Sequence, residues 1–126
     1  MDWKIELIHV PVSDVDRAKE FYVDKLGFNA DYDQRVSDDL RFVQLTPPGS
    51  ACSIAIGVGL GGTLHPGQQD GIQVVIPDAD SVLADLRAKG IDADGVDEQP
   101  WGRFVTLRDP DGNRWTLQQL PDYSAA

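Results

Sequence analysis

Residues 12–22, which read VSDVDRAKEFY, and residues 76–80, which read IPDAD, carry the same signal in the two halves of the chain. Each stretch follows an apolar run, over 5–12 and 72–76, that is typical of a strand. Each then opens a pattern of apolar residues at helical spacing. Ser13, Asp14, Asp78 or Asp80 can accept hydrogen bonds from the free N–H groups at the helix starts. A strand followed by a capped helix is therefore predicted twice.

The predicted helices also end alike. Gly27 and Gly90 stand where a residue in the left-handed conformation ends a helix, and an apolar residue, Phe28 or Ile91, follows each glycine. Because both the starts and the ends repeat about half a chain apart, the sequence indicates two copies of one structural unit.

After each helix the pattern changes to strands, with turns at 46–49 and 109–113. The predicted strands cover 28–36, 40–45 and 50–58 in the first half, and 91–98, 102–108 and 113–120 in the second. The fold class is thus α+β, with two tandem βαβββ modules over about 4–58 and 71–120 in one domain, 1–126. Residues 57–71 contain six glycines. We expect the connector, about 59–70, to be either a plain linker or a lid over a pocket.

Composition narrows the classes of partner. The 126 residues suit one domain, and the net charge of −10 argues against nucleic acid or an anionic membrane surface while permitting a cationic or neutral ligand. No apolar run is long enough for a transmembrane helix, and no signal peptide is visible. The single cysteine, Cys52, excludes a disulfide within the chain. We therefore expect a cytoplasmic protein.

Three motifs stand out: residues 12–22, the triplet Leu26-Gly27-Phe28, and residues 109–115, which read DPDGNRW. Together they resemble the glyoxalase, bleomycin-resistance and extradiol-dioxygenase group, the vicinal oxygen chelate superfamily. The resemblance covers nearly the whole chain. It implies a cup-shaped, curved mixed sheet with one helix per module on the outer face. In enzymes of this superfamily, His, Glu or Gln side chains from four strands hold a divalent metal in the cup.

Carried over one at a time, the metal-ligand positions of the family fall on Leu7, Ala55, Gly71 and Thr116. None supplies the imidazole or carboxylate that a divalent metal needs, and a single threonine hydroxyl binds weakly. A shift of two residues along the strands brings in His9, Gln73 and Gln118, a set with one imidazole, two neutral amides and no carboxylate. We therefore expect no metal and no other cofactor, with this second set as the residual metal hypothesis.

The same resemblance predicts which side chains line the cup, because side chains alternate along a strand. Trp101, in a loop before a strand, can either stack on a planar ligand or plug the end of the sheet. The faces of Tyr32, Phe42 and Phe104 are not fixed by the pattern. The candidate ligand-binding residues are Leu7, His9, Phe42, Gln73, Val75, Trp101, Phe104, Thr116 and Gln118.

The resemblance, together with the lack of ligand side chains at the family's metal positions, favours a metal-free small-molecule binding protein of the bleomycin-resistance type. It would sequester a drug or aromatic metabolite, either planar or cationic, and would form a homodimer. One alternative is a glyoxalase-like lyase or isomerase, or a dioxygenase, which would depend on a metal or use His9 as a base. A third possibility is a regulatory domain that keeps the scaffold alone.

Overall fold

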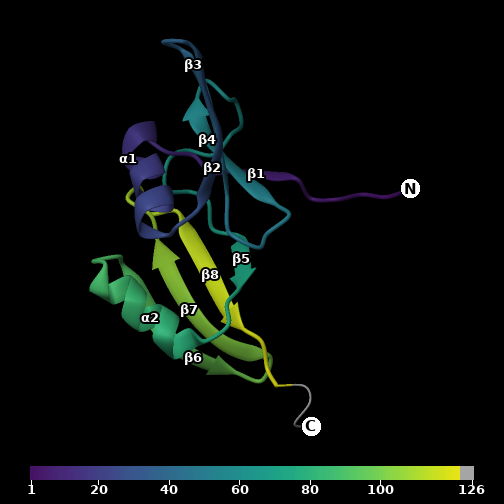
Figure 1. Cartoon of the computed structure of the whole chain (residues 1–126), viewed down its shortest axis with the longest axis vertical. Coiled ribbons are helices and arrows are strands. Elements are labelled where there is room, and N and C mark those ends of the chain that lie inside the picture. Colours follow the sequence, from purple (N-terminus) through teal and green to yellow (C-terminus); the bar gives the residue numbers. More distant parts are fainter. Residues whose placement is uncertain (123–126) are drawn as a thin grey trace. The chain divides into compact units, whose positions relative to one another are not determined.

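The computed structural model describes residues 1–122. The chain divides after Gln68 into two compact units. Each unit contains a strand, a helix and three further strands (Figure 1). The described chain thus has the α+β fold of two tandem βαβββ modules that the sequence predicted.

The sheet of the first unit has the strand order β1-β4-β3-β2. Strand β1 runs parallel to β4, while the other neighbours are antiparallel. Strand β1 is shorter than the apolar run predicted over 5–12, although the Val10 N–H still donates to the Ala55 carbonyl at 2.9 Å beyond its end. The bounds are β1 (Leu7–His9), β2 (Asn29–Ser37), β3 (Leu40–Thr46) and β4 (Ser53–Val58).

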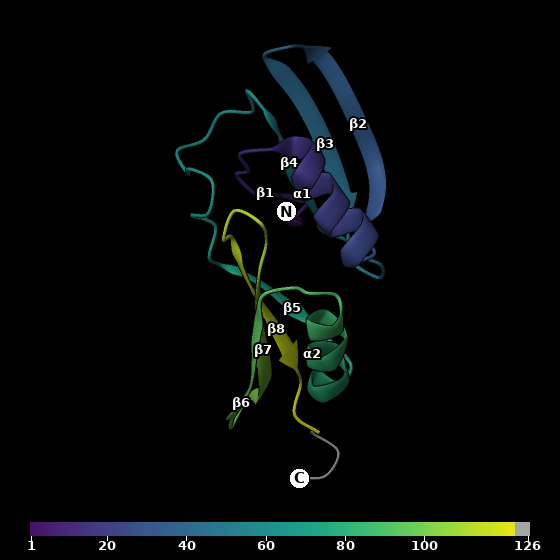
Figure 2. The ribbon, with the colours of Figure 1, turned by 90° about the vertical axis from the view of Figure 1, so that its left-hand side faces the viewer.

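The first helix begins as predicted but continues differently. The carboxylate of Asp14 caps α1 (Val15–Lys19) by accepting a hydrogen bond from the Arg17 backbone N–H. The helix then widens into a π-helix, η1 (Glu20–Lys25), rather than continuing as a uniform α-helix. The adjacent side chains of Phe21 and Tyr22 are both buried in this wider turn. Figure 2 shows the helix alongside the strands of its own unit.

The second unit repeats the plan with the strand order β5-β8-β7-β6 and parallel pairing of β5 with β8. Asp78 caps its helix at Ser81, and Gly90 ends it in the left-handed conformation at φ +72°. Among the described helices, none is both long and apolar enough to cross a bilayer. The bounds are β5 (Ile72–Val75), α2 (Ala79–Ala88), β6 (Ala93–Gln99), β7 (Gly102–Arg108) and β8 (Arg114–Gln119).

Each sheet buries one face against the helix of its own unit. In the first unit this face carries Val43, Leu45, Ile54 and Ile56, and in the second it carries Ile72, Val105, Leu107, Trp115 and Leu117. We call the opposite faces the helix-free faces. Strand register places Leu7, His9 and Phe42 on that of the first unit, and Gln73, Val75, Phe104, Thr116 and Gln118 on that of the second.

An arginine joins sheet to helix in the first unit. The guanidinium of Arg41 donates to both carboxylate oxygens of Asp33 at 3.0 and 2.8 Å and to Asp16 of α1 at 2.8 Å. The hydrogen bonds from Arg41 and Lys19 hold the pKa of Asp33 well below its usual range. Because 9% of the Arg41 side chain is exposed, this is a largely buried ion pair.

The second unit has a counterpart of this ion pair. Arg103 of β7 donates to both oxygens of Asp80 in α2 and to Glu98 of β6. Hydrogen bonding to Arg103 lowers the pKa of Asp80. Both arginines bridge a neighbouring strand and the helix, but Arg103 makes its two-oxygen contact with the helix carboxylate, and 31% of its side chain is exposed.

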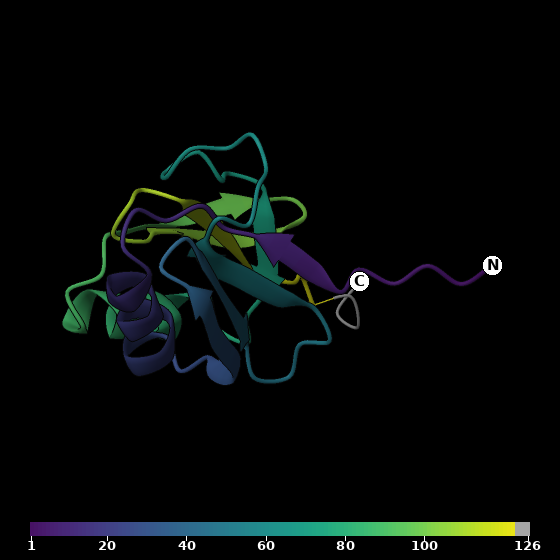
Figure 3. The ribbon, with the colours of Figure 1, turned by 90° about the horizontal axis from the view of Figure 1, so that it is seen from above.

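Residues 1–6 precede β1 as an extended segment that leads away from the strand (Figure 3). Its large apolar side chains are exposed, with Trp3 at 84% and Ile5 at 74%. The segment therefore contributes little to the core of its unit.

Candidate ligand-binding site

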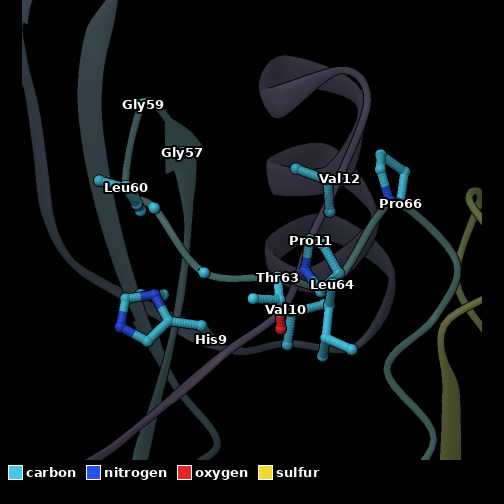
Figure 4. A pocket seen from close by; sticks show the side chains of 13 residues that line it. His9, Val10, Pro11, Val12, Gly57, Gly59, Leu60, Thr63, Leu64 and Pro66 are labelled. Carbon is cyan, nitrogen blue, oxygen red and sulfur yellow. The ribbon is translucent and has the colours of Figure 1, made fainter.

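A pocket of about 250 Å³ lies in the first unit, between the helix-free face and the glycine-rich connector (Figure 4). Strands β1 and β4 supply its sheet side through His9, Ala55 and Gly57. The connector supplies another side. The full lining consists of His9, Val10, Pro11, Val12, Ala55, Gly57, Gly59, Leu60, Gly61, Gly62, Thr63, Leu64 and Pro66.

The chemistry of the lining is mostly apolar. His9 is its one ionisable side chain and is exposed, and Thr63 adds a hydroxyl. The remaining members are aliphatic side chains, prolines and glycines. A pocket of this kind suits an apolar ligand that carries a group able to hydrogen-bond with imidazole.

The connector is held at both ends. Gly59 has φ +73°, and a Cβ there would lie 2.2 Å from the carbonyl oxygen of Asp39 in the β2–β3 turn. At the other end, the Gln68 N–H donates to the His65 carbonyl at 3.0 Å across Pro66-Gly67, with Gly67 at φ +87°. Proline followed by a left-handed glycine is the sequence of a type II turn. The connector forms one wall of the pocket, between the close approach of Gly59 to Asp39 and the turn at residues 65–68.

Three of the predicted residues in the second unit form one hydrogen-bonded chain. The Gln118 Oε1 accepts from the Gln73 Nε2 at 2.9 Å, and the Gln118 Nε2 donates to the Trp101 carbonyl at 2.9 Å. Gly102 permits this approach, because a Cβ there would lie 3.1 Å from the Gln118 Nε2. The Trp101 side chain is 60% exposed at the β6–β7 turn. It therefore does not plug the end of the sheet.

Strand register places the other predicted residues of this unit beside these hydrogen-bonded side chains. Phe104 and Val75 both lie opposite Gln118, and Thr116 lies opposite Gln73. Phe104 and Thr116 are half-buried, while Val75 is 62% exposed. The helix-free face of the second unit is therefore filled by amide, hydroxyl and aromatic side chains.

Not all of the predicted residues of the first unit line the pocket. His9 lines the pocket, but Leu7 and Phe42 do not. The pocket is at the end of β1, and Leu7 lies two residues earlier in that strand. Phe42 lies across β4 from it, opposite Gly57, with its ring 6.1 Å from that of Tyr32. Both rings share the helix-free face.

The residues present do not fit a divalent metal. Leu7 and Ala55 carry no donor atom, Gly71 has no side chain, and Thr116 offers one hydroxyl. The amides of Gln73 and Gln118 are bonded to each other. Within residues 1–122, no three His, Cys, Asp or Glu side chains are grouped so that they could hold a metal ion. We derive no chemistry through one.

The sequence allowed the connector to be a lid over a pocket, but the candidate residues did not include Leu60, Leu64 and Pro66, which line the pocket. The sequence held a signal for these residues. Leucines between glycines in a loop are not part of a helix or strand core, so they must either be exposed or pack on a neighbouring element. The small residues of β4 were a further signal. Ala55 and Gly57 alternate on one face and leave room beside the strand.

Comparison with known proteins shows the family to which the chain belongs. The family model for the glyoxalase/bleomycin resistance protein/dioxygenase superfamily matches residues 4–117, and the chain belongs to this superfamily. TnmS3, an antibiotic binding protein from Streptomyces sp. CB03234, is 36% identical over 95% of this chain and 98% of its own, with a TM-score of 0.86. A glyoxalase/bleomycin resistance protein from the same organism is 37% identical over 92% and 100%, with a TM-score of 0.80. An uncharacterized protein of Shewanella frigidimarina is 30% identical over 94% of this chain and 96% of its own.

Proposed function

We propose that this protein is a small-molecule binding protein of the bleomycin-resistance type that sequesters a drug or aromatic metabolite without a metal. The observation that carries the proposal is the pocket at His9, with its apolar lining and single ionisable side chain. Such a site provides apolar burial and one polar contact, which are what binding requires. The likeness to an antibiotic binding protein over nearly the whole chain supports the same function.

The charge of the chain bears on the ligand. A net charge of −10 attracts cations over long range, so a cationic or neutral ligand is favoured over an anion. Screening limits this attraction to about 8 Å at physiological salt. Affinity must therefore come chiefly from contacts inside the site.

The predicted contacts of the second unit belong to the proposal as well. Gln118 holds the backbone beside Trp101 by a hydrogen bond, which fixes the turn from which the exposed indole projects. An exposed indole on a fixed turn is suited to stacking on a planar ligand. We propose that Trp101 makes this stacking contact and that Gln73 and Gln118 are polar contacts.

Calorimetric titration tests the proposal, once a panel of planar aromatic compounds, cationic antibiotics included, has been screened by thermal shift. His9→Ala and Trp101→Ala should each weaken binding about tenfold or more, because central contacts carry most of the affinity. Val36→Ala is the control, since Val36 is 64% exposed on β2 and outside the pocket.

Two results would contradict the function. If no compound binds the parent protein, the chain is a scaffold or acts on something outside the panel's chemistry. Turnover of a bound compound by the parent, lost in His9→Ala, would favour the metal-free enzyme instead.

We also propose that the protein forms a homodimer. Strands β1 and β2 are the edges of the first sheet, and β5 and β6 are those of the second. Exposed sheet edges favour pairing with another chain. Light scattering at micromolar concentration should give twice the monomer mass of 13.8 kDa, and the monomer mass would contradict the proposal.

A further inference from the structure

The side chain of Leu60 occupies space that a missing side chain leaves beside β4. A Cβ on Gly57 would lie 2.7 Å from the Leu60 Cδ1 and 3.0 Å from its Cγ. Real side chains do not approach this closely, so Leu60 packs where it does because residue 57 is glycine. Figure 4 shows Leu60 and His9 on one side of the view, with Leu64 and Pro66 on the other.

The segment that carries Leu60 is held by little else. Gly59 and the His65–Gln68 turn hold its two ends, as described above. Between them, residues 60–64 form no hydrogen bond with any other described residue. Gly61 and Gly62 have φ +81° and +90° with open space around them, so they can turn without collision. Segments with few contacts open most readily.

The volume of the pocket bounds the part of a ligand that can enter it. A cavity of roughly 150 Å³ holds benzene. The pocket of about 250 Å³ therefore has room for two fused rings rather than three. Leu60 lines this space with its side chain packed beside Gly57 of β4, so shortening it would enlarge the pocket on its sheet side.

This inference rests on the proposed function. We propose that Leu60 is the residue that determines ligand size: it limits the pocket to a two-ring planar group carrying one hydrogen-bonding substituent for His9. Replacing Leu60 by Ala removes three carbon atoms, close to the four that a third fused ring adds. The glycines that follow allow the segment to move aside while a ligand enters.

Titration of three probes, phenol, 2-naphthol and 2-hydroxyanthracene, into the full chain tests the assignment. The probes have one, two and three rings and one hydroxyl each. The parent should bind 2-naphthol at least tenfold more tightly than either of the others. Leu60→Ala should gain at least tenfold for 2-hydroxyanthracene, whereas Leu60→Phe should lose 2-naphthol and retain phenol. Leu120→Ala is the control, because this leucine is 46% exposed and lies outside the pocket.

The outcomes separate the two proposals. A shift of ring preference in both Leu60 variants, with none in the control, supports the role of Leu60. If the parent and Leu60→Ala bind the three probes with the same preference, the role of Leu60 is wrong and the binding function stands. If no probe binds the parent or either variant saturably, both proposals are overturned. Melting curves of each variant show that a loss of binding is not a loss of folding.

Discussion

Replacing Arg41 by Gln removes the guanidinium that joins β2 and β3 to α1. Three hydrogen bonds are lost, two to Asp33 and one to Asp16, at 2.8–3.0 Å. Glutamine keeps part of the side-chain length but cannot reproduce the charge or the two-pronged contact. Asp33 keeps one cationic partner, Lys19, at 2.9 Å.

The burial of the pair sets the size of the effect. The Arg41 side chain is 9% exposed, Asp33 is 26% exposed and Asp16 is 80% exposed. Breaking a fully buried ion pair costs roughly 3–5 kcal/mol, and a hydrogen bond to a charged group contributes roughly 1.5–3 kcal/mol. Because the carboxylates can regain water, we expect Arg41→Gln to lower the free energy of unfolding by about 2–3 kcal/mol at pH 7.

The same pair predicts a dependence on pH. The folded pKa of Asp33 is depressed by its hydrogen bonds to Arg41 and Lys19, so this carboxylate stabilises the fold above the unfolded pKa of about 3.9. That stability is lost as the pH falls through 4 towards the lower folded value. In Arg41→Gln the depression is smaller. The variant should therefore lose less stability than the parent between pH 5 and pH 3.

Urea denaturation followed by circular dichroism measures both effects, with Arg103→Gln as the matched control. Arg103 makes the equivalent contacts to Asp80 and Glu98 in the second unit, but its side chain is 31% exposed. Its loss should therefore cost less, as is usual for exposed ion pairs. Equal destabilisation by the two substitutions would refute the burial argument, and parallel acid profiles of parent and Arg41→Gln would refute the role of Asp33.

Three further predictions concern other parts of the molecule. Leu117→Ala should cost about 2–5 kcal/mol in urea denaturation, since the side chain is 5% exposed against the helix, and unchanged stability would place it outside the core. Asn113→Ala should cost about 1–3 kcal/mol, because the buried Asn113 amide accepts from the Gln69 N–H at 3.0 Å and donates to Asp109 at 2.8 Å. Asn113→Asp should be less stable still, since two carboxylates would then face each other. EDTA should leave the melting temperature unchanged, and a metal retained near one per chain after washing, measured by plasma mass spectrometry, would contradict the donor-set argument.

Local features of this fold could be predicted from the sequence because their partners are close along the chain. Asp14 and Asp78 each cap a helix by accepting a hydrogen bond from the backbone N–H three residues further on, and Gly27 and Gly90 follow directly after the helix ends. Such interactions need no knowledge of tertiary packing. Alternation along β5 and β8 likewise indicated which side of the second sheet is buried, whereas the pattern did not fix the face of Phe104 on β7. The repetition of these signals in both halves is what made the two modules, and with them the superfamily, predictable.

The pocket depended on contacts between a loop and strands that are distant from it in the sequence. No local sequence pattern encodes such contacts. The sequence placed His9 on a strand, but the packing of the connector beside it depended on the space at Gly57 of β4 and the close approach of Gly59 to Asp39. The face on which Phe42 lies followed from its pairing with Gly57, which is a property of strand register. Tertiary structure alone decided the burial of Arg41 against that of Arg103, because both have the same sequence context and differ in what packs around them.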